Sequence, residues 1–352
     1  MAGLSNNIGA GNFSRPGSDN AAADKKGLFI EIFAGQVLNM FNMATVTMGR
    51  HLVRNISEGK QANFPVTGGA TSGYHTPGNA VDFQSITHSE KVIAIRDLLV
   101  AATFISNYEE KMNHFEVRSE YAKQLGQALA EEMDGAVLRN MVLAARSTSN
   151  ITVSPKSKSG SIITGATADA ISGDVGKLVT AFYSAAQRLD ENNAPSQGRQ
   201  AFIKPLEYYA LFRSSGTTAV SDMVNRDLGG DGSVAEARMP KIAGIEVVKT
   251  NNMPTTDESS STPNTQQTAL DLDYGKNICV INTPEAVGTV KLMDLAVESE
   301  YAIANQGHQM VARLAAGHGV LRPECSVEVN DAGTTAAGAF NTADSDDVEE
   351  VS

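Results

Sequence analysis

The chain has 352 residues, 41% of them hydrophobic, so it can bury a sizeable core and is long enough for two or three domains. Its formal charge of -12 excludes the broad attraction to nucleic acid that depends on many lysine and arginine side chains. Only Cys279 and Cys325 could form a disulfide, and neither lies in a CxxC pair, which favours a reducing site of folding.

Neither export nor membrane insertion is expected from the sequence. Residues 1–15 are rich in Gly, Asn and Ser and lack the basic patch and apolar core of a signal peptide. The most apolar run, residues 92–105, is interrupted by Arg96 and Asp97 and is too short to cross a bilayer. We therefore expect a soluble protein with no membrane partner.

The first fifty residues predict a polar arm that contains one short helix. A Gly-rich segment leads into residues 28–43, where Leu28, Ile32, Val37 and Met40 recur at helical spacing. We therefore interpret the segment as an arm with a short helix.

Residues 60–90 predict a long hairpin. Short strings at residues 64–66 and 81–83 flank a Gly-rich tip. Two strands with few apolar side chains cannot form a core of their own. We therefore expect this hairpin to lie on another surface, most simply that of a neighbouring subunit.

Residues 107–146 predict one helix about 60 Å long at 1.5 Å per residue. A compact globule of this chain length would be only about 50 Å across, so the helix predicts an extended subunit that meets its neighbours. Asn107 is placed to cap the first turn, and Glu110 completes a variant of the capping box. Gly126 and Gly135 each cost about 1 kcal/mol inside a helix, so a bend or break near either is an alternative.

The apolar side chains of this helix recur at steps of three, four or seven residues and predict one buried face. They are Tyr108, Met112, Phe115, Ala122, Leu125, Leu129, Met133, Ala136 and Val137. The opposite face is expected to be solvated, and Glu131, Glu132 and Asp134 are assigned to it.

The remaining segments mix helices and strands without regular alternation, which predicts the α+β class. A polar linker at residues 147–160 precedes an amphipathic helix at residues 172–189, and Pro205 is suited to begin a further helix that ends near Phe212. Strands are expected at residues 201–203, 244–248, 278–281 and 287–292, with a loop at residues 251–267.

Residues 331–352 contain six acidic side chains and no basic one. Their Ala, Gly and Thr residues cannot form a core, so the segment predicts a flexible, solvated tail. A tail that serves as an acidic recognition segment is the alternative.

No motif predicts catalysis, a metal site or a cofactor. No two of the six histidines are four residues apart, and His88-Ser89-Glu90 matches only the first half of a deaminase zinc motif. Residues 230–235 fit a dinucleotide-type G-x-G-x-x-A string but follow no strand, and residues 173–178 lack the glycine spacing of a phosphate loop. We therefore expect a protein that is not an enzyme.

Several strings resemble one protein family. Residues 112–121, Met-Asn-His-Phe-Glu-Val-Arg-Ser-Glu-Tyr, closely resemble the major capsid proteins of short-tailed bacteriophages, and Gln124-Leu125-Gly126 continues the likeness. Similar strings occur in order at residues 51–54, 64–66, 90–93, 244–248, 286–296 and 317–324. The rest of residues 147–277 and the acidic tail depart from the pattern.

The resemblance implies the tailed-phage capsid fold, which has an amino-terminal arm, an extended hairpin loop, a peripheral domain with a long spine helix, and an axial domain. On this chain the divisions would be 1–54 for the arm, 55–95 for the extended hairpin loop, 96–150 for the peripheral domain with its spine helix, 151–285 for the axial domain, 286–330 for the return strands of the peripheral domain, and 331–352 for the acidic tail.

The resemblance also implies a major capsid protein that self-assembles as hexamers and pentamers into an icosahedral shell around the double-stranded DNA genome. A scaffold protein and a portal protein would be partners, DNA would be enclosed without sequence-specific binding, and the virion would be assembled in the bacterial cytoplasm. Intersubunit contacts are expected at Arg54, Lys60, Phe64, Tyr74, Phe83 and Glu120. Nothing in the sequence indicates Lys to Asn crosslinks, so we expect non-covalent closure.

Two alternatives remain at this point. A bacterial nanocompartment shell shares this fold and encloses a cargo enzyme instead of DNA. An enzyme of a different class would need a pocket that the sequence does not indicate.

Overall fold

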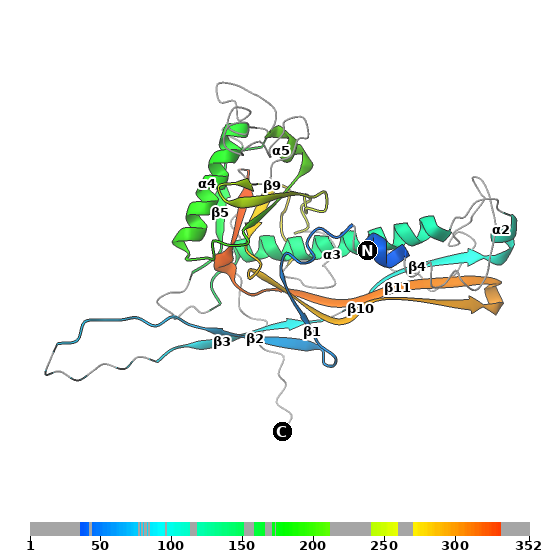
Figure 1. Cartoon of the computed structure of the whole chain (residues 1–352), viewed down its shortest axis with the longest axis horizontal. Coiled ribbons are helices and arrows are strands. Elements are labelled where there is room, and N and C mark those ends of the chain that lie inside the picture. The colour runs from blue at the N-terminus through cyan, green and yellow to red at the C-terminus, as the bar shows by residue number, and fades with distance from the viewer. Residues whose placement is uncertain are drawn as a thin grey trace.

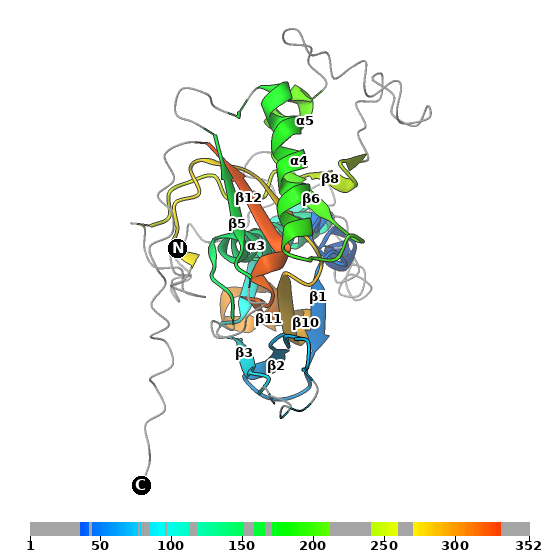
Figure 2. The same ribbon diagram turned by 90° about the vertical axis from the view of Figure 1, so that its left-hand side faces the viewer.

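A computed structural model describes residues 36–41, 44–76, 78, 80, 83, 85–95, 97–112, 118–150, 158–165, 171–172, 174–211, 241–259 and 270–331. The molecule is elongated, and one long helix runs along part of its length (Figure 1). A six-stranded sheet with two helices stands on one side of this helix, and a four-stranded sheet lies on the other. A two-stranded hairpin lies below the four-stranded sheet, and the view along the long axis shows the same stacking (Figure 2).

The four-stranded sheet has the order β1-β10-β11-β4. Its members are β1 (Leu52–Asn55), β4 (Leu99–Ser106), β10 (Val287–Ala302) and β11 (Gly307–Val320). β1 is parallel to β10, and the other pairs are antiparallel. β10 is far longer than the predicted 287–292, and its second half is polar at Asp294 and at residues 298–300.

The predicted single helix over residues 107–146 is wrong, because the structure has two helices in this range. The structure has a short helix, α2 (Asn107–Met112), at the far end of the sheet, and a separate helix, α3 (Arg118–Arg146), which is about 44 Å long at 1.5 Å per residue. Residues 113–117 lie outside the described residues, as does Phe115 of the predicted buried face. α3 continues through Gly126 and Gly135, so neither glycine ends it.

The capping prediction for Asn107 is also wrong. Its backbone N–H donates to the carbonyl of Gln306, and its Nδ2 donates to the hydroxyl of Tyr301 at 3.0 Å, while its Oδ1 finds no donor among the described residues. The start of α2 is therefore held by the turn between β10 and β11. Tyr108 and Met112, which were predicted to be buried, are 72% and 60% exposed.

The predicted buried face is confirmed within α3. Ala122, Leu129 and Met133 are buried against Ile105, Met310 and Leu314 of the sheet, and Ala136 and Val137 are buried too. Leu125 is partly buried. The helix therefore rests along β4 and β11 through the side chains that the spacing indicated.

The prediction that the carboxylates of α3 are exposed to solvent is confirmed for Glu131 and wrong for Asp134. Glu131 is exposed, Glu132 is intermediate, and Asp134 is completely buried. From residue 136 to residue 145 nearly every side chain is buried, because this half of α3 lies between the two sheets. Amphipathic spacing predicts only one covered face, so it does not reveal a helix enclosed on both sides.

The six-stranded sheet has the order β5-β12-β9-β6-β8-β7. Its strands are β5 (Ser161–Thr164), β6 (Gln200–Ile203), β7 (Lys241–Ile242), β8 (Ile245–Lys249), β9 (Asn277–Asn282) and β12 (Ser326–Asn330). α4 (Val175–Glu191) and α5 (Pro205–Ala210) pack with this sheet. The predicted strands at residues 201–203, 244–248 and 278–281 are confirmed, as are the two helices apart from small shifts in their bounds.

β12 is a late strand that lies outside the four-stranded sheet. It pairs with β5 and β9 in the six-stranded sheet and also packs against α3. The residues assigned to 286–330 are thus shared between both sheets. Predicted features at residues 28–35, 151–157, 212–240, 260–269 and 332–352 lie outside the described residues.

The hairpin is confirmed, but its second strand lies later in the chain than predicted. β2 (Gln61–Thr67) pairs antiparallel with β3 (His88–Ala94), while Phe83 lies in no strand and Val81 and Asp82 are outside the described residues. Side chains of β3 alternate between more and less exposed positions, and only Ile93 among them is buried. Alternation, rather than an apolar string, therefore marks the strand. His88 is an exposed strand residue, as the absence of a complete zinc motif indicated.

Close approach between the arm helix and α3 depends on Gly126. The helix at residues 36–41 buries Val37 and Phe41 against α3, and a Cβ at Gly126 would lie 2.6 Å from the carbonyl oxygen of Val37. Since this neighbour is backbone, a side chain cannot be accommodated by a rotamer change.

We therefore expect Gly126→Val to lower the free energy of unfolding by about 2 kcal/mol, the middle of the range for overpacking. Urea unfolding monitored by circular dichroism measures this. Gly73→Ala is the matched control, because no atom lies within 4 Å of a Cβ built there. Equal stability of the two variants would contradict the assigned packing of the arm on α3.

Candidate intersubunit surface

The base of the hairpin is anchored on its own subunit by glycines of the four-stranded sheet. A Cβ at Gly319 would lie 2.8 Å from Ile93, and one at Gly317 would lie 2.5 Å from the carbonyl oxygen of Ala94. Ile93 and Ala62 are buried there with Val290 and Leu321. Gly317 begins the string at residues 317–324 that resembles the capsid family, and its close contact with β3 leaves no room for a side chain.

The far part of the hairpin has no such cover on its own subunit. Tyr74 and Phe83 are 109% and 91% exposed, and Ile86 is half exposed. β2 and β3 lead away from the molecule toward one end, while the strands β4, β10 and β11 extend toward the other (Figure 1). Exposed aromatic side chains on a projecting arm are typical of residues that bind a partner.

The other predicted contact residues divide into two groups. At the hairpin base, Arg54 donates from Nη1 to the carbonyl of Asn63 at 3.1 Å and lies 5.4 Å from the ring centroid of Phe64. Lys60 is exposed at the same base, where its carbonyl accepts from Ile95. Glu120 instead lies near the start of α3 and pairs with Lys123 at 2.5 Å. The structure thus brings Arg54, Lys60 and Phe64 together but does not place Glu120 with them.

Sequence reasoning missed a second apolar surface at the opposite end of the molecule. Tyr108, Met112 and Ile303 are exposed there, the last by 74%, and Tyr301 lies beside them with its hydroxyl bound to Asn107. We call these four side chains the ribbon tip. The spacing of Tyr108 and Met112 is the available signal, but on one continuous helix over residues 107–146 that spacing predicts a buried face.

A shallow groove of about 380 Å³ runs between α3 and the segment at residues 251–258. Arg139 of α3 makes a two-pronged pair with Glu258 across it, with its Nε 3.0 Å and its Nη2 2.9 Å from the two carboxylate oxygens. Burial by itself lowers the pKa of Arg139, but the hydrogen bonds that it donates to Glu258, together with the nearby negative charges, outweigh this effect and raise the pKa. The pair holds the loop against the helix and offers no reactive group.

A buried ion pair joins the end of α3 to the six-stranded sheet. Nε and Nη2 of Arg146 each lie 2.6 Å from a carboxylate oxygen of Glu328 on β12, and the two side chains are 3% and 0% exposed. Nη1 donates to the carbonyl of Asp273, and the guanidinium lies 5.7 Å from the ring centroid of Tyr274. This contact fixes the six-stranded sheet onto α3.

Chemical groups suited to catalysis do not converge in the described part of the chain. No group of three or more metal-binding side chains was found there. Both thiols are free and buried, and burial raises the pKa of Cys279 and of Cys325. Among the same residues no helix is long and apolar enough to cross a membrane.

The geometry is that of a subunit with surfaces for neighbours, and comparison with known proteins decides the family. The family model described as "Gp10A-like: Major capsid protein" matches residues 63–330. The chain belongs to this family. It is therefore a major capsid protein, a structural component of a tailed-phage virion shell and not an enzyme.

Relatives support this major capsid protein assignment over nearly the whole chain. The major capsid protein of Enterobacteria phage T3 is 33% identical over 331 residues, which cover 88% of this chain and 93% of that protein. The major capsid protein of Escherichia phage T7 is 34% identical, with 87% and 92% covered. The capsid structure of the cyanophage P-SCSP1u has 38% identity and a TM-score of 0.71, with 83% of this chain and 89% of that chain covered. The predicted resemblance and the α+β tailed-phage capsid fold are thus confirmed.

Removal of Arg146 tests the contact between α3 and the six-stranded sheet of this capsid protein. Arg146→Ala leaves the Glu328 carboxylate buried and unpaired, so we expect the free energy of unfolding to fall by about 3 to 5 kcal/mol. Arg188→Ala, which breaks an exposed pair with Glu191, is the matched control, and its effect should be small. Chemical denaturation of both variants provides the measurement, and equal losses would refute a special role for the buried pair.

Proposed function

We propose that this capsid protein assembles as hexamers and pentamers in which the hairpin at residues 61–94 lies across the adjacent subunit. The observation that carries the proposal is the full exposure of Tyr74 and Phe83 on an arm that extends away from its own subunit. Each such contact is modest, but a closed shell repeats it many times, and the repetition stabilises the whole.

The division of labour within the subunit follows from its layers. We assign α3 and the four-stranded sheet to a peripheral domain, and the six-stranded sheet with α4, α5 and β12 to an axial domain around the symmetry axes. Residues 1–54 would be the arm and residues 55–95 the hairpin loop. The ribbon tip, at the opposite end from the hairpin, would then face a different neighbour.

The shell would enclose double-stranded DNA without sequence-specific contacts, with a scaffold protein during assembly and a portal protein at one vertex. The chain's net charge of -12 supports enclosure over tight binding. Closure would be non-covalent. The match to major capsid proteins favours this role over that of a nanocompartment shell that holds a cargo enzyme.

The hairpin proposal is tested by Tyr74→Ser combined with Phe83→Ser. Neither side chain packs in the subunit, so the melting temperature should change little while closed shells are lost or become rare in electron micrographs. Ser72→Ala with Ser85→Ala alters the same loop without removing an aromatic ring and should assemble normally. Normal shells from the aromatic double variant would count against the proposal.

A truncation tests whether the acidic tail takes part in assembly. Oδ1 of Asp331 accepts from the backbone N–H of Ile171 at 2.7 Å, so a tail deletion must retain this residue. Removal of residues 332–352 should leave both stability and shell formation unchanged, because the segment cannot contribute to a core. Removal of residues 331–352 should lower stability by about 1 kcal/mol, since the part-buried backbone N–H of Ile171 then loses its acceptor. Sedimentation and thermal melting of the two truncations measure these effects, and lost assembly in the shorter deletion would give the tail a structural role.

A further inference from the structure

Two buried histidines from distant parts of the sequence are joined through one threonine hydroxyl. Nε2 of His51 lies 2.7 Å from Oγ1 of Thr289, which lies 2.8 Å from Nδ1 of His318. On its other side, Nδ1 of His51 lies 2.9 Å from the carbonyl oxygen of Thr47. The chain of contacts therefore crosses from the arm to β10 and β11, where Thr289 and His318 are direct cross-strand partners.

The chemistry of the groups decides which atoms donate. The carbonyl of Thr47 can only accept, so Nδ1 of His51 carries a proton and, in the neutral ring, Nε2 does not. Thr289 must then donate its single proton to Nε2 of His51. Its oxygen is left to accept from Nδ1 of His318. The network thus holds two neutral rings, each with its proton on Nδ1.

The network can carry one added proton but not two. One proton is accommodated either on Nε2 of His318 or by reversal of the bonds through Thr289. When both rings are charged, the hydroxyl oxygen of Thr289 faces an N–H donor on each side, and its own proton has no partner in the network. Two positive rings would also lie on either side of one oxygen atom in a buried site, where their repulsion is strong.

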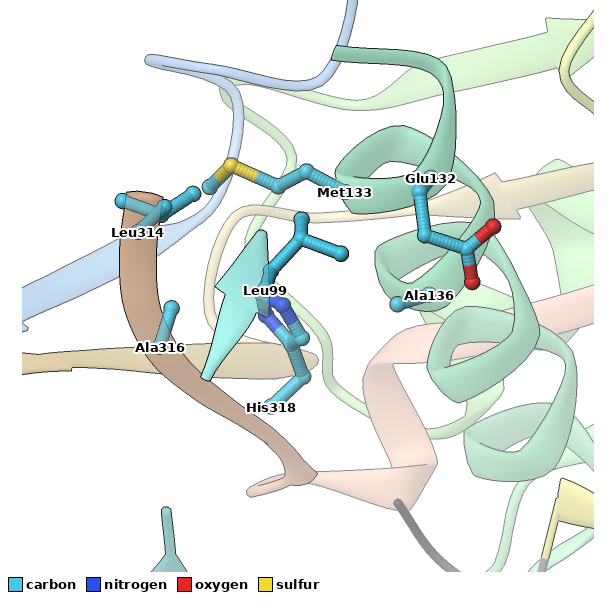
Figure 3. A pocket seen from close by; sticks show the side chains of 7 residues that line it. All are labelled: Leu99, Glu132, Met133, Ala136, Leu314, Ala316 and His318. Atoms are coloured by element: carbon cyan, nitrogen blue, oxygen red, sulfur yellow. The ribbon is translucent and has the colours of Figure 1, made fainter. Parts of the chain in front are cut away.

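The charged groups around the network come from the adjoining elements. The carboxylate of Asp134 on α3 accepts from the backbone N–H groups of Val46 and Thr47 and, at 2.5 Å, from the Thr47 hydroxyl. Lys291 of β10 is a second nearby charge, and it pairs with Asp294 at 3.4 Å. Arg50 forms an ion pair with Glu246, with Nη1 2.8 Å from Oε1. Glu132 lines the water-sized cavity beside His318, but its carboxylate points away from the ring (Figure 3).

Burial lowers the pKa of both histidines, that of His318 to about 3, and the positive charge of Lys291 acts in the same direction. Asp134 and the Thr47 carbonyl oppose the shift at His51. Because both folded-state pKa values lie below the ordinary value of 6.5, the folded chain binds fewer protons than the unfolded chain in acid. The stability that the neutral rings provide is therefore present above about pH 6.5 and falls as the pH decreases toward 3.

We propose that the Thr47–His51–Thr289–His318 network is an acid-sensitive latch that holds residues 44–55 of the arm on the sheet and opens when two protons are bound. The inference rests on the subunit's own contacts and is independent of the proposed assembly. Opening frees the arm segment while the apolar contacts of α3 with β4 and β11 persist.

Hydrogen exchange of the full-length chain between pH 7 and pH 4, corrected for the intrinsic exchange rate, tests the latch. Uptake of two protons predicts that exchange of residues 44–55 rises about 100-fold per pH unit at most, and uptake of one predicts about tenfold. In His318→Asn the amide keeps a hydrogen-bond donor near the place of Nδ1 but cannot titrate. The exchange rate of residues 44–55 in this variant should therefore rise only about tenfold per pH unit. His88→Asn, at an exposed site on β3, is the matched control and should behave as the unaltered chain does.

A second variant tests the same latch through its surroundings. Lys291→Met removes the positive charge that opposes protonation, so opening should move to higher pH. Equal steepness in the unaltered chain and in His318→Asn would overturn the proposal. The proposal would also be overturned if opening in Lys291→Met occurred at the same or a lower pH than in the unaltered chain. Global unfolding before any release of residues 44–55 would overturn it as well.

Discussion

The enclosure of the second half of α3 between two sheets is the constraint on which the rest of the structure depends. A helix covered on both sides cannot leave its polar side chains to water, so each must find a partner within the protein. Asp134 holds the arm, Arg139 holds the segment that ends at Glu258, and Arg146 holds β12. Three charged side chains on one helix thus attach three separate parts of the chain, and each attachment satisfies a group that would otherwise be costly to bury.

The extended shape follows from the same arrangement. Since α3 provides a common core for both sheets, the four-stranded sheet can continue well past it toward the ribbon tip, and the hairpin can leave in the opposite direction. Neither projection has enough apolar side chains to fold alone. Each therefore leaves aromatic or aliphatic side chains exposed at its end, as expected for a subunit whose surface is completed by copies of itself.

Local periodicity predicted secondary structure correctly where one face of an element is buried and the other is exposed to solvent. α4 was predicted with small shifts in its bounds, because Leu178, Phe182 and Leu189 follow the helical period. The same reasoning failed at the hairpin, where β3 has a single fully covered side chain, and at Asn107, whose partners come from the turn after β10. Neither the hairpin's second strand nor the start of α2 is determined by nearby residues alone.

The sequence by itself determined the family, the α+β class, the strands β6, β8 and β9 with the helices α4 and α5, and the existence of a hairpin and a long helix. These depend on residue strings and on periodicities that act over a few turns or strand residues. Only the tertiary structure decided that Asp134 is buried, that β12 crosses to the other sheet, and that His51 meets His318 through Thr289. Those outcomes depend on contacts between residues far apart in the chain. The spacing of residues within one segment does not indicate which distant residues will contact it.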